Sequence, residues 1–155
     1  DMSRDFAIQV IDRNGTAVGT DFALFVEFVT LPNGNASGSI LSPGDSPNSL
    51  TVGALDGTSI ADYSSRGPLS NGGLKPDLVA PGFLELNGSY FVGTSASSSL
   101  VTGAASLVWE AYPDYSAQDV FTFLLNSAQD DGEIAGRDNI YGNGSLYLPI
   151  PDVSD

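Results

Sequence analysis

Residues 93–111 read GTSASSSLVTGAASLVWEA, the longest regular pattern in the chain. Apolar side chains recur in it at steps of three and four residues, which is the spacing of one face of an α-helix. The pattern predicts a buried helix that begins near Thr94 or Ser95 and runs to about Ala111, where a tyrosine and a proline end it. Gly103 lowers helix propensity by about 1 kcal/mol relative to alanine, so we expect a neighbour there that packs too closely for a Cβ. The apolar face comprises Leu100, Val101, Ala104, Ala105 and Val108.

Shorter patterns on both sides of this helix predict the other elements. Ser116 is placed to cap a second, amphipathic helix, with Asp119 near the positive end of its dipole. An alternating segment from Phe6 to Val29, broken at Arg13–Thr16, predicts a β-hairpin, and the Gly- and Pro-rich residues after it predict a long loop. Short apolar runs predict strands near residues 50–55, 59–63, 77–80 and 145–148. Together these elements indicate an α/β fold.

Composition excludes several classes of function. The 155 residues carry 41% hydrophobic and 15% charged side chains, as a folded domain does. No apolar run approaches the roughly 18 residues that a membrane-spanning helix needs. The formal net charge of -14 would repel the phosphate backbone, so no nucleic acid is expected as a partner. Cysteine and histidine are absent, which removes thiol chemistry and the usual general base.

Ser95 occupies a position with chemical consequences. It lies at the start of the predicted helix, where unpaired backbone N–H groups point outward. Such groups can stabilise a developing oxyanion. A serine at this place can serve as a nucleophile or simply as a helix cap.

Four ordered motifs separate these two readings. They are Leu50–Ala54 (LTVGA), Tyr63–Pro68 (YSSRGP), Lys75–Gly82 (KPDLVAPG) and Gly93–Ala96 (GTSA). In this order and spacing they resemble the C-terminal half of a subtilisin-like serine peptidase domain. The resemblance covers roughly Ser42 to Leu148. It divides the chain into a β-hairpin or inserted β-module with its loop at 1–41, the peptidase part at 42–148 and a tail at 149–155.

The resemblance implies an incomplete subtilisin-like α/β domain, with a mostly parallel sheet around a buried central helix. It assigns the nucleophile to Ser95 and its substrate-binding flank to Gly93 and Thr94. The second oxyanion donor is expected upstream, beyond an inserted β-module, with Asn35 as the alternative. Related peptidases carry their Asp and His earlier in the chain, so this chain alone is expected to be inactive. We expect the missing half, or another chain, to supply both residues and to cover the exposed sheet edge. Peptides are the implied substrates, and no cofactor is required.

The sequence also supports competing hypotheses. Ser97, Ser99 and Leu100 depart from the motif, where Ala, Pro and His are common, so a catalytically dead module of an extracellular surface or filament assembly is the alternative. Lys75 is the only lysine, but it lies in a segment that resembles a structural part of the family, so we do not expect a Ser–Lys pair. A third hypothesis is a carbohydrate- or calcium-binding module, based on oxygen ligands or aromatic rings at Asp130, Asp131, Asp138, Asn139, Trp109, Tyr112 and Tyr115.

Four Asn-x-Ser/Thr triplets lie in turn-like segments. Because this triplet is the acceptor for N-glycosylation, the sequence predicts a secreted or cell-surface glycoprotein. Turn chemistry alone also explains asparagine beside glycine. The acceptor positions are Asn14, Asn35, Asn87 and Asn143.

Overall fold

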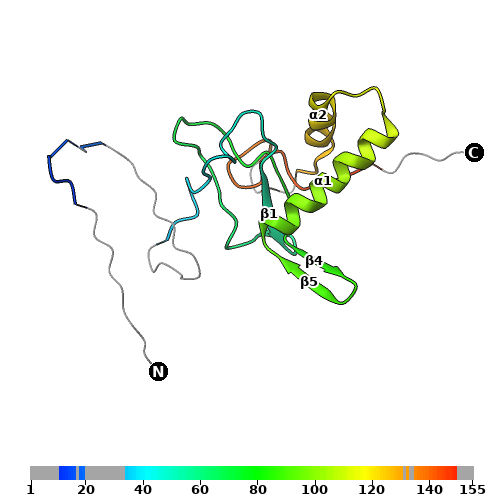
Figure 1. Ribbon diagram of the computed structural model, residues 1–155, viewed down its shortest axis with the longest axis horizontal. Helices are drawn as coiled ribbons and strands as arrows, with labels where there is room; N and C mark the ends of the chain where they lie inside the picture. The colour runs from blue at the N-terminus through cyan, green and yellow to red at the C-terminus, as the bar shows by residue number, and fades with distance from the viewer. Residues whose placement is uncertain (1–10, 17, 20–33, 131, 133–134, 150–155) are drawn as a thin grey trace, which may run out of the picture. The chain divides into compact units, whose positions relative to one another are not determined.

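The computed structural model describes residues 11–16, 18–19, 34–130, 132 and 135–149. The chain forms two units, Asp1–Pro32 and Asn33–Asp155. In the first unit, the strands of the hairpin predicted from Phe6 to Val29 lie outside the described residues. Within the expected turn, the Asn14 N–H donates a hydrogen bond to Asp12 Oδ1 at 3.1 Å. All the helices and strands described below belong to the second unit (Figure 1).

A three-stranded sheet forms the centre of the second unit. Its order is β2 (Ser59–Ile60), β1 (Val52–Asp56), β3 (Leu78–Pro81). β1 and β3 are parallel, whereas β1 and β2 are antiparallel. The sheet is therefore mixed, not mostly parallel as expected. The strand predicted at 145–148 is reduced to isolated bridges, which join Ser145 to Val79 and to Gln129.

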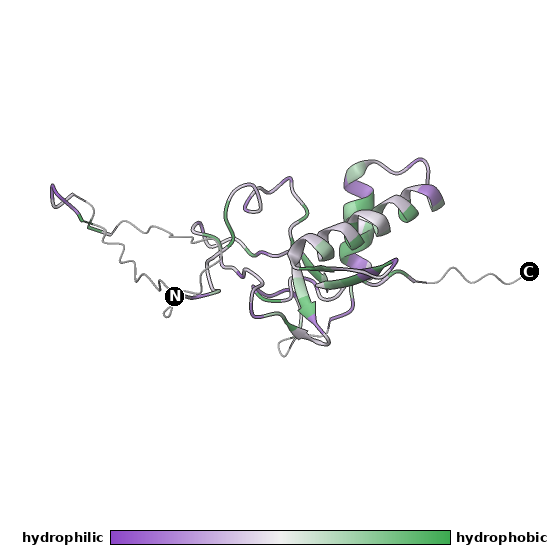
Figure 2. Ribbon diagram, turned by 60° about the horizontal axis from the view of Figure 1, so that its bottom comes forward, coloured by the Kyte–Doolittle hydropathy of each residue, from purple (hydrophilic) through white to green (hydrophobic). Residues whose placement is uncertain are grey.

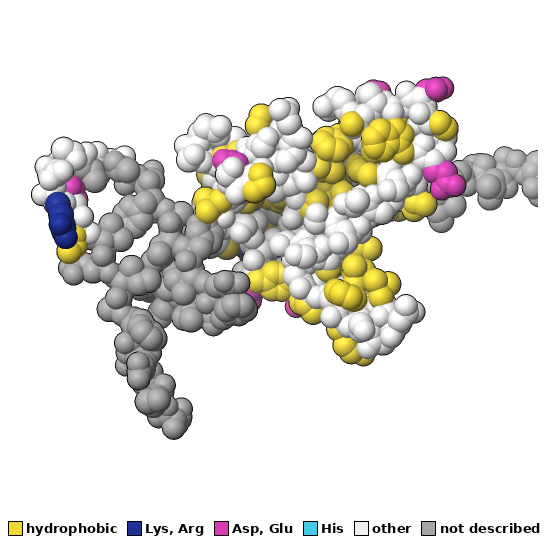
Figure 3. All heavy atoms as spheres, in the orientation of Figure 1, with side chains coloured by type: hydrophobic (Ala, Val, Ile, Leu, Met, Phe, Trp, Pro, Cys, Tyr) yellow, Lys and Arg dark blue, Asp and Glu magenta, His cyan; other side chains and the backbone are white. Residues whose placement is uncertain are grey.

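A separate two-stranded hairpin follows β3. It consists of β4 (Phe83–Leu86) and β5 (Ser89–Val92), paired antiparallel. Asn87 and Gly88 connect the strands with φ of 52° and 77°, the positive values that a tight turn between twisted strands requires. Aromatic and aliphatic side chains on both strands are exposed, and Figure 3 shows hydrophobic atoms gathered over this hairpin.

Two helices follow, and both predictions of helix position are confirmed. α1 spans Thr94–Ala111 and packs against β1 and β3, and α2 spans Ala117–Ser127 and packs against α1. In Figure 2, where hydrophobic residues are green, green segments mark the hydrophobic residues of the helices and of the sheet. The core that they share buries enough apolar surface to hold helices and sheet together. It comprises Leu78, Ala80, Val101, Ala104, Val108, Val120 and Leu124.

The predicted cap of α2 is present as a reciprocal capping box. The Ser116 hydroxyl donates to Asp119 Oδ2 at 2.6 Å and accepts from the Asp119 N–H at 3.3 Å, while the Ser116 N–H donates to the same carboxylate at 2.9 Å. These bonds, that of the Ser116 hydroxyl first, lower the pKa of Asp119 below its ordinary value. The cap thus fixes the turn between the two helices.

The close neighbour predicted at Gly103 of α1 is not found among the described residues. A Cβ built on Gly103 meets nothing within 4 Å among the described residues, and Gly103 is exposed. The described residues bury only one side of this helix. The exposed residues, which we expected to be covered, are mostly small and polar, but they include the large hydrophobic side chains of Leu107 and Trp109. Separately, no helix in the described part of the chain is long and apolar enough to cross a bilayer.

Candidate active site

Ser95 is the second residue of α1 and its side chain is exposed. Gly93 precedes the helix with φ 121° and ψ 176°, and its carbonyl accepts hydrogen bonds from the N–H groups of Ala96 at 3.0 Å and Ser97 at 3.4 Å. In the described structure, no side chain caps the first turn. The hydroxyl of Ser95 thus lies at a positive, uncapped helix end, where negative charge is stabilised.

Two shallow hollows adjoin this end of α1. One is lined by Ser95, Thr94 and Ser98 together with residues 43–44 and 49–52. The other lies between residues 39–41, Tyr63 and Thr94. Thr94 borders both, whereas Gly93 lines neither. Thr94 thus lies where both hollows meet, and the substrate-binding roles of Thr94 and Gly93 stay predictions.

Asn35, the alternative to an upstream residue as second oxyanion donor, lines neither hollow. It is exposed, and its Oδ1 accepts a hydrogen bond from the Ser37 N–H at 3.0 Å. Its segment is held within the second unit by the Gly38 N–H, which donates to Gly67 O at 3.0 Å. The described residues do not bring Asn35 to Ser95, so its role as a donor remains an expectation.

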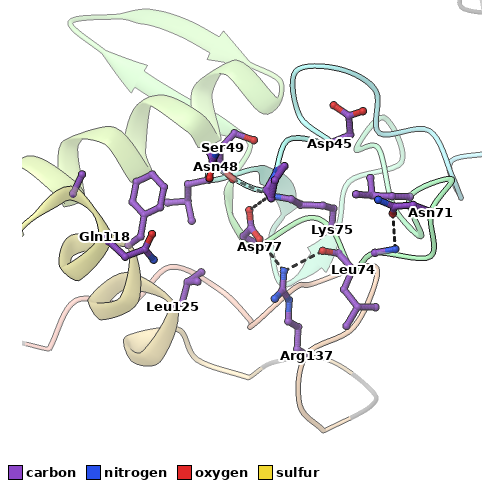
Figure 4. Close-up of a pocket in the computed structure, with 16 residues that line it drawn as sticks. Asp45, Asn48, Ser49, Asn71, Leu74, Lys75, Asp77, Gln118, Leu125 and Arg137 are labelled. Atoms are coloured by element: carbon purple, nitrogen blue, oxygen red, sulfur yellow. Dashed lines mark hydrogen bonds and ion pairs between the residues drawn. The ribbon is translucent and has the colours of Figure 1, made fainter.

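Lys75 lies in a buried ionic cluster (Figure 4). Its Nζ contacts Asp77 Oδ2 at 2.5 Å and donates to Ser49 O at 2.8 Å. The other carboxylate oxygen of Asp77 accepts from Arg137 at 2.8 Å, and the Thr51 N–H donates to Oδ2 at 2.8 Å. Both Lys75 and Asp77 are over nine-tenths buried. The ammonium of Lys75 is therefore held by acceptors, and Lys75 does not line the hollow beside Ser95.

A cavity of about 660 Å³ opens beside this cluster, between residues 45–50, 69–75 and the start of α2 (Figure 4).

Sequence reasoning missed the pairing of Asp77 with Arg137, because the two residues are 60 positions apart. No local pattern carries such a contact, and only the folded chain brings the two side chains together.

Asp130 and Asp138, which were considered for calcium binding, accept backbone hydrogen bonds, whereas Asn139 Oδ1 is buried without a partner among the described residues. Asp130 Oδ2 accepts from the Gly136 N–H at 2.6 Å, and Asp138 Oδ1 accepts from the N–H groups of Ile140 and Tyr141 at 2.7 Å each. Asp131 lies outside the described residues. Within the described ranges, no three or more Asp or Glu side chains gather as a metal site would require. The aromatic rings pack on each other: those of Tyr112 and Tyr115 stack at 4.7 Å, and Trp109 Nε1 donates to Tyr115 O at 2.7 Å.

The four candidate glycosylation positions differ in environment. Asn14, Asn35 and Asn87 are exposed. Asn143 is half-buried, and its Nδ2, the atom that would carry a glycan, donates to Asp77 O at 2.8 Å. A glycan would have to replace the second hydrogen of this half-buried, hydrogen-bonded nitrogen.

The fold and the site define an α/β domain that presents an exposed serine at a helix N-terminus, an arrangement suited to a serine hydrolase. The model of the subtilase family (Peptidase_S8) matches residues 14–144, and the chain belongs to this family. Two relatives are the serine protease AprX of Bacillus subtilis, 32% identical over 142 residues, and subtilisin Savinase of Lederbergia lenta, 32% identical over 124 residues. The solved structure of Sphericase superposes with a TM-score of 0.63 at 28% identity.

The comparisons also define how much of a subtilase this chain represents. The match covers 74% of the chain but 32% of AprX, and 75% of the chain but 42% of Savinase. For Sphericase the shares are 75% of this chain and 45% of the solved one. The chain thus spans less than half the length of these relatives.

Proposed function

We propose that this chain is the nucleophile-bearing part of a serine endopeptidase. The observation that carries the proposal is the exposed hydroxyl of Ser95 at the uncapped N-terminus of α1. An imidazole base from a preceding segment or another chain takes the proton of Ser95 Oγ as the oxygen attacks a peptide carbonyl. The acyl-enzyme forms as the amine leaves with a proton from the imidazolium, and water then releases the acid.

Backbone N–H groups at the start of α1 face the oxygen that becomes negative in this reaction. Each such donor contributes about 10² to 10³ in rate. The helix dipole adds to this effect, because the first turn carries its positive end. Asn35 is the candidate for a side-chain donor, provided that completion of the domain brings it to Ser95.

The exposed side of α1 supports a partner that completes the domain. The hydroxyls of Ser99, Thr102 and Ser106 each donate to the carbonyl four residues earlier, at 2.8 to 3.0 Å. Because these three hydroxyls are already paired, covering them leaves none of the three donors without a partner. We propose that the segment supplying Asp and His covers it.

The second candidate function is the catalytically dead module. It is favoured by Ser97, Ser99 and Leu100, which stand where alanine, proline and histidine are common in the family motif. In that case the domain would still be completed, but Ser95 would lack an activating base.

A fluorophosphonate probe distinguishes the two functions, because it labels only an activated serine. We expect the intact polypeptide that carries this sequence to be labelled, and the 155-residue chain alone to remain unlabelled. Mass spectrometry of the digested protein locates the label. Absence of label on a folded, intact polypeptide that contains the Asp and His would favour the dead module.

We also propose that the protein is extracellular and glycosylated at Asn87. One relative is named as the minor extracellular protease Vpr of Bacillus subtilis. Asn87 is exposed in the turn between β4 and β5, so an enzyme can approach its amide. We expect peptide mass mapping of protein secreted by a glycosylating host to find glycan at Asn87 and none at Asn143. A glycan at Asn143, or an unmodified Asn87, would contradict this assignment.

A further inference from the structure

Ser97 lies two residues after Ser95, and its side chain is fully buried. Its hydroxyl donates to Pro81 O at 3.1 Å, across from α1 to the last residue of β3. Four other helical hydroxyls bond within their own helix, because each donates to the carbonyl four residues earlier. They belong to Ser99, Thr102, Ser106 and Thr122. Ser97 thus forms a link between two elements.

A second bond attaches the other side of the same turn to the same corner. The Gly93 N–H donates to Gly82 O at 2.8 Å. Gly93 and Ser97 lie two residues before and two residues after Ser95, and their acceptors are consecutive residues. The two bonds therefore hold the nucleophile's turn on both sides.

The corner that accepts these bonds is closely packed. A Cβ on Gly82 would collide with Tyr63 Oη and would lie 3.0 Å from the Cβ of Ala54. The Tyr63 hydroxyl donates to Gly82 O at 3.3 Å, and the Gly82 N–H donates to Leu55 O at 2.8 Å. A turn attached to this corner is attached to the central sheet.

We propose that Ser97 is a positioning residue for Ser95, an inference that rests on the proposed peptidase function. In the absence of a side-chain cap on α1, the Ser97 hydroxyl fixes the first turn against β3. It thereby fixes the positions of Ser95 Oγ and of the neighbouring backbone N–H groups, between which the reacting carbonyl must bind. The family motif commonly has alanine here, so the departure at Ser97 adds a hydrogen bond that alanine cannot make.

The test compares the intact polypeptide with its Ser97→Ala variant, which keeps the side-chain volume close to the original. We expect kcat for a peptide substrate to fall about tenfold, the effect of one lost hydrogen bond, with KM changed less than twofold. We also expect backbone amides of the first turn of α1 to exchange with deuterium about tenfold faster. Thr122→Val, which removes an exposed hydroxyl of α2 that is bonded only within its own helix turn, should change neither quantity.

Two results would overturn the proposal. One is a Ser97→Ala protein with a lower unfolding midpoint but wild-type kcat, since that would make Ser97 merely structural. The other is unchanged amide exchange in the first turn, since that would show that the bond to Pro81 does not hold it. If the wild type itself fails to react with the fluorophosphonate probe, the peptidase function fails. Amide exchange still decides in that case whether Ser97 fixes the turn.

Discussion

Replacing Ser95 with alanine is expected to abolish peptide hydrolysis by the intact polypeptide. The variant loses the only oxygen that can form the acyl-enzyme in this mechanism, so kcat should fall by roughly 10⁴-fold or more. Ser95 is exposed, so alanine leaves no cavity and the unfolding midpoint should stay close to the wild-type value. Initial rates at saturating substrate, with unfolding curves for both proteins, measure these effects.

Thr122→Val provides the control for this experiment. It removes a hydroxyl from an exposed position on α2, outside the helix that carries Ser95, and should retain wild-type kcat. A Ser95→Ala protein that still hydrolyses peptides at more than about a hundredth of the wild-type rate would assign the reaction to another group.

Replacing Asp77 with asparagine is expected to destabilise the fold by about 3–5 kcal/mol. The change keeps the size of the side chain but removes the negative charge that faces Lys75 and Arg137. The Lys75 ammonium, buried to about 94% of its side chain, would then lack a counter-ion. Denaturant unfolding of the intact polypeptide measures the loss, which should appear as a lower midpoint with an unchanged slope.

Two further variants test this explanation. Asp114→Asn removes a charge from an exposed aspartate and should change stability by less than about 0.5 kcal/mol. The double variant Lys75→Met, Asp77→Leu removes both buried charges, and we expect it to be less destabilised than Asp77→Asn. A double variant that loses more than Asp77→Asn would mean that shape and hydrogen bonding, not the uncompensated charge, dominate the effect.

Both helices could be predicted from the sequence because their signals are local. The spacing of Val101, Ala104 and Val108 gives the buried side of α1, and Ser116 with Asp119 gives the start of α2. The β4–β5 hairpin was missed, although Asn87–Gly88 between two apolar runs is the usual signature of a tight hairpin turn. Attention to that dipeptide would have found it.

Contacts between distant residues could not be predicted in the same way. The bond from Ser97 to Pro81 and the pairing of Asp77 with Arg137 depend on how the elements pack, and no periodicity encodes them. The expectation of a close neighbour at Gly103 was wrong for the described residues because that side of α1 is open. Ser95 itself was identified by its motif. Its place at the start of a helix was not sufficient, because many serines near helix starts are ordinary caps.

A structure of the intact polypeptide offers the most direct test of the proposal that Ser95 is a nucleophile completed from elsewhere. We expect a histidine nitrogen from outside these 155 residues to lie within about 3 Å of Ser95 Oγ, which is the reach of proton transfer. We also expect an added segment to cover the side of α1 that carries Ser99, Thr102 and Ser106. A folded, intact structure with no imidazole near Ser95 Oγ, or with that side of α1 open to solvent, would contradict it.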